Sequence, residues 1–141
     1  SNPTNANHAT RKGYVDAQIQ QKPESFILAC SDETTDLTAS SSVAKVTFRM
    51  PYAFNLSAVR ASVSTAPAGS TITVDVKSGG TSIFDVGLTI DAGEKTSTSA
   101  STPAVIGNDS LSDDEEITVF CTSVGSSTAG KGLKVTLIGN Q

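Results

Sequence analysis

Tryptophan is absent from this 141-residue chain, and aromatic residues make up only 5% of it. A hydrophobic core must therefore rest on Val, Ile, Leu and five Phe residues. No apolar run approaches the roughly 20 residues of a membrane-spanning helix, so we expect no membrane insertion. The formal net charge is −4 and no basic stripe is present, which argues against a nucleic-acid partner.

Cysteine is nearly absent too, because Cys30 and Cys121 are the only two. Each continues an alternating hydrophobic face, so the preferred interpretation is two buried thiols that behave as small hydrophobic groups. The less favoured alternative is a disulfide between the first strand and the penultimate one. With His8 as the only histidine, the soft ligands are too few for a tetrahedral zinc site. We expect neither a metal nor another cofactor.

Catalytic residue patterns are also lacking. His8 precedes the β-rich region, which disfavours Ser-His-Asp and Cys-His chemistry. Four consecutive acids at 113–116 provide neither the spaced carboxylate pair of a glycosidase nor an alternating calcium loop. We interpret them as a solvated loop that also shields a strand end. Asp32, Glu33 and Asp36 are interpreted as a polar turn. The sequence therefore predicts a protein that is not an enzyme.

The composition changes near Pro23, which divides the chain into residues 1–23 and residues 24–141. The first segment is rich in Ala, Gln, Lys and Arg. On a helix it would carry one narrow stripe, too thin to be buried within a single chain. The stripe consists of Tyr14, Val15, Gln18 and Ile19. We predict a short helical stem that trimerises through these residues; a tail without regular structure is the alternative.

From residue 24 onward the sequence is rich in Ser and Thr and alternates between apolar and polar residues. In one stretch, Val59, Ala61 and Val63 are predicted to face inward, and the intervening residues outward. The expected strands cover residues 26–30, 43–50, 54–65, 71–77, 81–86, 88–90, 116–124 and 132–138. Seven or eight strands with short turns predict an all-β, antiparallel β-sandwich, jelly-roll-like. A small closed barrel is the alternative.

Three connections look irregular: 31–42, 92–112 and 125–131. The middle one is long and polar, and such loops are usually functional or mobile. These loops are the first place to look for a partner at one end of the sandwich. Arg49 and Arg60 are expected on the outward faces of neighbouring strands. There they could pair with Asp75 or Asp85, or line a contact between subunits.

One short motif carries a resemblance to a known family. In the segment from Pro3 to Asp16, the key positions are Pro3, His8, Ala9, Lys12, Tyr14, Val15 and Asp16. With these residues the segment resembles a stretch of bacteriophage tail-fibre and other virion fibre proteins that leads into a trimerising shaft. The β-rich region also resembles a module of phage structural proteins, at residues 46–52, 59–62, 79–83, 88–95 and 132–139.

The resemblance implies a non-enzymatic, homotrimeric virion protein with a β-sandwich head for host attachment. Its partners would be copies of itself, other virion proteins, and a host-surface glycan or protein. It would be located on the virion, on a tail or head fibre, and no family binding residue carries over. The alternatives are a capsid-decorating head fibre without a host ligand, a carbohydrate-binding module with few aromatic residues for stacking, and an enzymatic tail spike.

Overall fold

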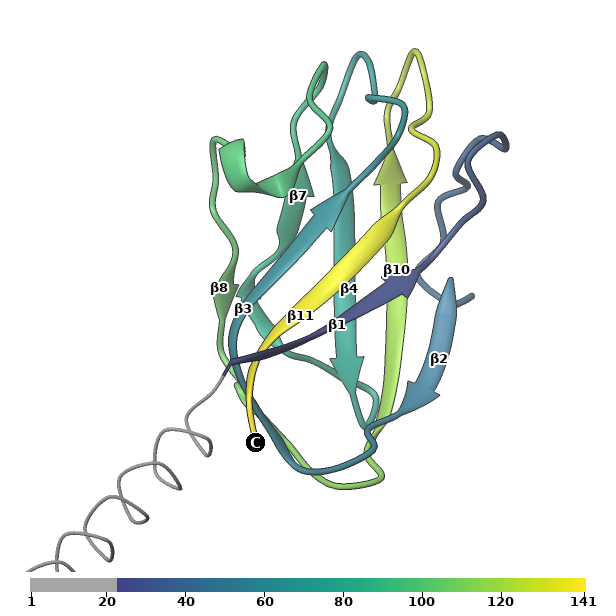
Figure 1. The fold of residues 1–141 in the computed structure, drawn as a ribbon. Coiled ribbons are helices and arrows are strands. Elements are labelled where there is room, and N and C mark those ends of the chain that lie inside the picture. The colour runs from purple at the N-terminus through teal and green to yellow at the C-terminus, as the bar shows by residue number, and fades with distance from the viewer. Residues whose placement is uncertain (1–22) are drawn as a thin grey trace, which may run out of the picture.

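The computed structural model describes residues 23–141, and within them the chain is all-β with antiparallel sheets. The predicted helical stem, with Tyr14, Val15, Gln18 and Ile19, lies outside the described residues. The two main sheets face each other in a sandwich-like arrangement (Figure 1).

The first sheet has four antiparallel strands in the order β1 (Glu24–Ala29), β11 (Lys134–Asn140), β3 (Phe54–Ser62) and β9 (Ser110–Leu111). The second has the order β2 (Val46–Arg49), β10 (Glu116–Val124), β4 (Ile72–Ser78) and β5 (Thr81–Ser82), with β7 (Leu88–Ile90) also paired to β4. A separate two-stranded sheet consists of β6 (Phe84–Val86) and β8 (Val105–Ile106). One short 3₁₀ helix, η1 (Ser97–Ser99), follows β7. Both main sheets have ends, so they do not form the closed barrel.

Alternation of side chains produces the core between the sheets. In β4, Ile72, Val74 and Val76 are fully buried, while the residues between them are only partly covered. The facing sheet contributes Val59 and Leu137 to the same cluster. Burying these side chains stabilises the fold by about 1.5–3 kcal/mol each before the entropy cost of ordering the chain. Branched aliphatic side chains thus form most of the core in this chain with few aromatic residues.

The predicted strands are largely confirmed, and the differences have local causes. The strand expected at 43–50 covers only Val46–Arg49, and Val43 is exposed outside it. The strand expected at 81–86 is divided at Ile83 between two different sheets. The connection at 92–112 holds η1, β8 and β9, because short segments there pair with β6 and β3.

The described chain begins and ends at the same end of the sandwich. Glu24 of β1 pairs with Gly139 of β11. The Glu24 carboxylate accepts hydrogen bonds from the Tyr52 hydroxyl and, at 2.8 Å, from Gln141 Nε2. Nearby, the rings of Phe26 and Tyr52 pack at a centroid distance of 5.9 Å. These contacts tie the start of the sandwich to its last residues.

Several loops meet at the opposite end (Figure 1). The Gly93 N–H donates to the Pro67 carbonyl at 2.8 Å, and the Ala68 N–H donates to the Thr128 carbonyl at 2.9 Å. These bonds join the β3–β4, β7–η1 and β10–β11 connections. The sandwich therefore has a terminal end, where the described chain starts and stops, and a loop end.

Candidate functional site

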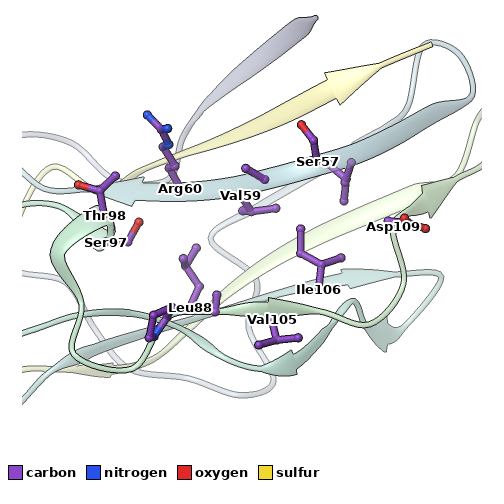
Figure 2. Close-up of a pocket in the computed structure, with 13 residues that line it drawn as sticks. Ser57, Val59, Arg60, Leu88, Ser97, Thr98, Val105, Ile106 and Asp109 are labelled. Atoms are coloured by element: carbon purple, nitrogen blue, oxygen red, sulfur yellow. The ribbon is translucent and has the colours of Figure 1, made fainter.

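The most distinctive recess lies along one edge of β3. On one side β3 pairs with β11 along most of its length. On the other side, β9 pairs only with Phe54 and Asn55, and Thr96 forms an isolated bridge with Ser62. Between these pairings, residues 57–60 pair with no strand on this side of β3 among the described residues. Figure 2 shows the recess that results, which we call the β3 groove; its volume is about 650 Å³.

The sequence opens this groove because the chain between η1 and β9 turns away to pair with β6. Phe84 lies opposite Ile106, and Val86 lies opposite Val105. Strand β8 therefore forms the far wall of the groove instead of a further strand against β3 (Figure 2). The Leu56 N–H donates to the Asp109 carbonyl at 2.7 Å, which marks the point where the chain returns to β3.

The lining combines an apolar interior with a polar rim. Val59 and Leu88 are buried, and Ile106 is partly buried. The polar residues of the lining are Ser57, Arg60, Ser97, Thr98 and Asp109. No aromatic side chain is part of the lining. A recess of this size and composition can hold a small ligand or a short stretch of extended chain.

Backbone groups of β3 also face the groove. The Ala61 N–H donates to Ser97 Oγ at 2.9 Å, so it points away from β11. Backbone groups alternate between the two sides of a strand. The N–H and C=O of Val59, two residues earlier, therefore point into the groove as well. These groups are ready to form hydrogen bonds with an extended chain.

Opposite charges flank the groove. Arg60 and Asp109 are both exposed, and neither side chain forms an ion pair within residues 23–141. Asp109 contributes only its backbone carbonyl, to Leu56. The groove can therefore select a ligand that carries one negative and one positive group.

Within residues 23–141, neither Arg49 nor Arg60 forms the expected ion pair with Asp75 or Asp85. Arg49 is on β2 and Arg60 on β3, which belong to different sheets. Arg49 lies 3.8 Å from both Asp114 and Glu116, because β2 pairs with β10 at its acidic start. Asp75 instead accepts a hydrogen bond from Ser82 at 2.5 Å.

The acidic run at 113–116 forms the turn that leads into β10. Asp113 and Asp114 are exposed, and Asp114 has a φ of 60°. Glu115 accepts a hydrogen bond from the buried Ser78 hydroxyl at 2.5 Å. The run is thus a solvated turn with one carboxylate used to satisfy a buried hydroxyl.

The second acidic patch is a polar turn held by local hydrogen bonds. Asp32 Oδ1 accepts from the backbone N–H groups of Thr34 and Thr35 at 3.0 and 2.7 Å, and the Thr35 bond is the larger cause that lowers the pKa of Asp32. Lys134 Nζ lies 2.6 Å from Glu33 Oε1 and lowers the pKa of Glu33. The patch thus supports the turn after β1.

Both cysteines are buried and carry free thiols. The disulfide considered as the less favoured alternative is not formed in this structure. Burial raises the pKa of Cys30 and that of Cys121 to about 11. Each Sγ donates weakly to a nearby carbonyl: that of Cys30 to Leu28 at 3.6 Å, and that of Cys121 to Ser123 at 3.3 Å. The thiols are therefore protonated components of the core.

Within residues 23–141, no group of three or more His, Cys, Asp or Glu side chains is placed to hold a metal ion. The same residues contain no helix long and apolar enough to cross a membrane. Comparison of the chain with models of protein families, with curated proteins and with solved structures gave no match.

Sequence reasoning did not identify the β3 groove. Its lining comes from β3, β7, η1, β8 and the segment before β9, which are distant along the chain. The one available signal was the length of the 92–112 connection, which supplies Ser97, Thr98 and Asp109. That connection was expected to act at one end of the sandwich, and the structure places these residues along its side.

Proposed function

We propose that this chain is a non-enzymatic virion structural protein, the head of a homotrimeric bacteriophage fibre that contributes to host attachment. Residues 1–23 are its helical, trimerising stem, and residues 24–141 are its head. The single observation that carries the proposal is the strand order of the two main sheets, which supports a jelly-roll-like sandwich.

Apart from the two-residue strand β5, each main sheet has four strands. They are β1-β11-β3-β9 in one sheet and, in the other, β2-β10-β4 with β7 beside β4. Along the chain, β1, β2, β3 and β4 alternate between the sheets, and β9, β10 and β11 alternate again. Two interleaved four-stranded sheets are the arrangement of jelly rolls, a fold of viral capsid and lectin domains.

The two ends of the sandwich support a role in display. The described chain begins at the terminal end with Glu24, beside the last strand, β11. The loops that share backbone hydrogen bonds, including Ala68 to Thr128, lie at the other end. A stem that precedes Glu24 would hold the head by its terminal end and leave the loop end and the β3 groove accessible.

A trimer would present three copies of every surface at once. Linked copies make later binding events intramolecular, which raises the effective affinity of weak individual contacts by large factors. Host attachment can therefore rely on modest single sites. The absence of aromatic side chains from the groove lining disfavours the carbohydrate-binding module, because sugar rings usually stack on such side chains.

Immunoelectron microscopy tests this function. Antibodies raised against residues 24–141 should label virus particles at the tips of fibres. Label distributed over the capsid would favour the capsid-decorating alternative. Absence of label from every part of the particles would contradict the proposal. Antibodies against an unrelated jelly-roll protein provide the control.

A further inference from the structure

We propose that the β3 groove binds an extended segment of another protein by strand addition. The bound segment runs antiparallel to β3, with an acidic residue beside Arg60 and a basic residue four positions later, beside Asp109. This inference rests on the proposed function and deepens it by naming a polypeptide as the partner class.

The first argument is the interruption of hydrogen bonding along β3. At one end of the gap the Asp109 carbonyl accepts from the Leu56 N–H, and at the other Ser97 Oγ accepts from the Ala61 N–H. Both ends are thus occupied by groups from this chain, and the stretch between them is open. At a rise of about 3.3 Å per residue, residues 57–60 leave room for roughly 13 Å of extended chain.

The second argument is the far wall. Strand β8 pairs with β6 on one side, and within residues 23–141 it has no partner strand on the other. Val105 and Ile106 of β8 line the groove opposite Val59 (Figure 2). An inserted segment would therefore lie between two strands, which is more favourable than addition to a single exposed edge. Strand addition of this type takes affinity from the backbone and specificity from alternate side chains.

The third argument is the chemistry of the lining. Val59 and Leu88 are buried, so they favour small apolar side chains on the inward face of the segment. Arg60 and Asp109 are exposed and unpaired within residues 23–141, and they lie towards opposite ends of the gap (Figure 2). Their charges complement a segment that is acidic at its start and basic four residues later. This charge pattern fixes the direction of binding.

A capped peptide of sequence Glu-Val-Thr-Val-Lys is the direct probe, measured by two-dimensional NMR on the full chain. We expect saturable shifts at Val59, Arg60 and Ile106. The reversed peptide, Lys-Val-Thr-Val-Glu, should bind about tenfold more weakly because two favourable ion pairs become repulsive. The forward peptide methylated at alternate backbone nitrogens should lose binding altogether.

Variants make the test specific. The double variant R60E/D109K should reverse the preference, so that the reversed peptide binds more tightly. R60Q should weaken binding of the forward peptide. R49Q removes an arginine on the other sheet and should leave the affinity for the forward peptide unchanged. Because Arg60 and Asp109 are exposed, these variants should fold, and their amide spectra check this directly.

Four outcomes would overturn the inference. The first is absence of binding by the forward peptide at millimolar concentration. The second is equal affinity for both peptides, and the third is groove shifts caused by a uronic acid but by neither peptide. The fourth is a solution molar mass that R60E/D109K lowers, since the occupant would then be a second copy of this chain. The first three results do not depend on the trimer, so this inference and the proposed function can fail separately.

Discussion

Ser97 takes the place of a neighbouring strand at the edge of β3, where its hydroxyl oxygen accepts a hydrogen bond from the Ala61 N–H at 2.9 Å. Ser97 begins η1, whose N-cap residue, Thr96, accepts from the Thr98 N–H. A side chain on a short helix thus satisfies a backbone donor that a continuous sheet would have paired. The contact also defines where the β3 groove ends.

Replacing Ser97 with Ala should reduce stability. The variant removes the acceptor for the Ala61 N–H and should cost about 1 kcal/mol, the usual net value of one hydrogen bond. Urea unfolding of the full chain measures the change. S101A is the matched control, because the exposed Ser101 uses only its backbone N–H, which donates to Asp91. Equal stabilities for the two variants would contradict this role of Ser97.

The bulge between β3 and β11 requires a glycine at position 139. A Cβ there would lie 1.9 Å from the Asn55 carbonyl oxygen, which belongs to the backbone and cannot move independently. G139A should therefore destabilise the fold by about 2–3 kcal/mol. At Gly87 the nearest atom to an added Cβ is Thr73 Cγ2, at 3.8 Å. Thermal unfolding should show little change for G87A; a similar loss in both would contradict the account.

Stability should fall as pH rises above about 9. The pKa of Cys30 and that of Cys121 are about 11 in the folded chain, against an ordinary value of 9.0. Between these values the folded state holds more protons than the unfolded state, so the contribution is complete below pH 9 and is lost as pH rises towards 11. Over this range each thiol makes the unfolding free energy fall by at most about 1.4 kcal/mol per pH unit. The unfolding free energy of C30A/C121A should vary less steeply over pH 9–11 than that of the parent chain.

Because both cysteines carry free thiols, a thiol reagent should label them only after the chain unfolds. In the native chain, buried and protonated thiols should react slowly with an aromatic disulfide reagent, because the thiolate is the reactive form. After unfolding in denaturant without reductant, two thiols per chain should react. Recovery of no thiols under those conditions would instead establish the disulfide between Cys30 and Cys121.

Much of the sandwich could be predicted from the sequence because several of its strands, including β1, β4 and β11, alternate regularly. Ile72, Val74 and Val76 are fully buried, as the period-2 pattern of β4 indicates. The arrangement of Val59 and Ala61 towards the core, with Arg60 outward, is confirmed for the same reason. Such patterns depend only on neighbouring residues.

The β3 groove could not be predicted because it depends on pairings between distant segments. Strands β8 and β9 have two residues each, which is too short for any periodic signal. Whether Arg60 lies beside Asp75 or beside a groove is decided by which sheet β3 joins, and single-sequence patterns do not specify strand order. The long 92–112 connection indicated only that this part of the chain was unusual.

The most direct test of the proposed function is the molar mass of the full chain in solution at micromolar concentration, measured by light scattering after size exclusion. The account predicts a homotrimer, with three times the chain mass of 14.4 kDa. A version that starts at Glu24 then identifies the interface: a fall to monomer assigns it to the stem, and a retained trimer assigns it to the head. A full chain that elutes with the mass of one copy would contradict the central claim.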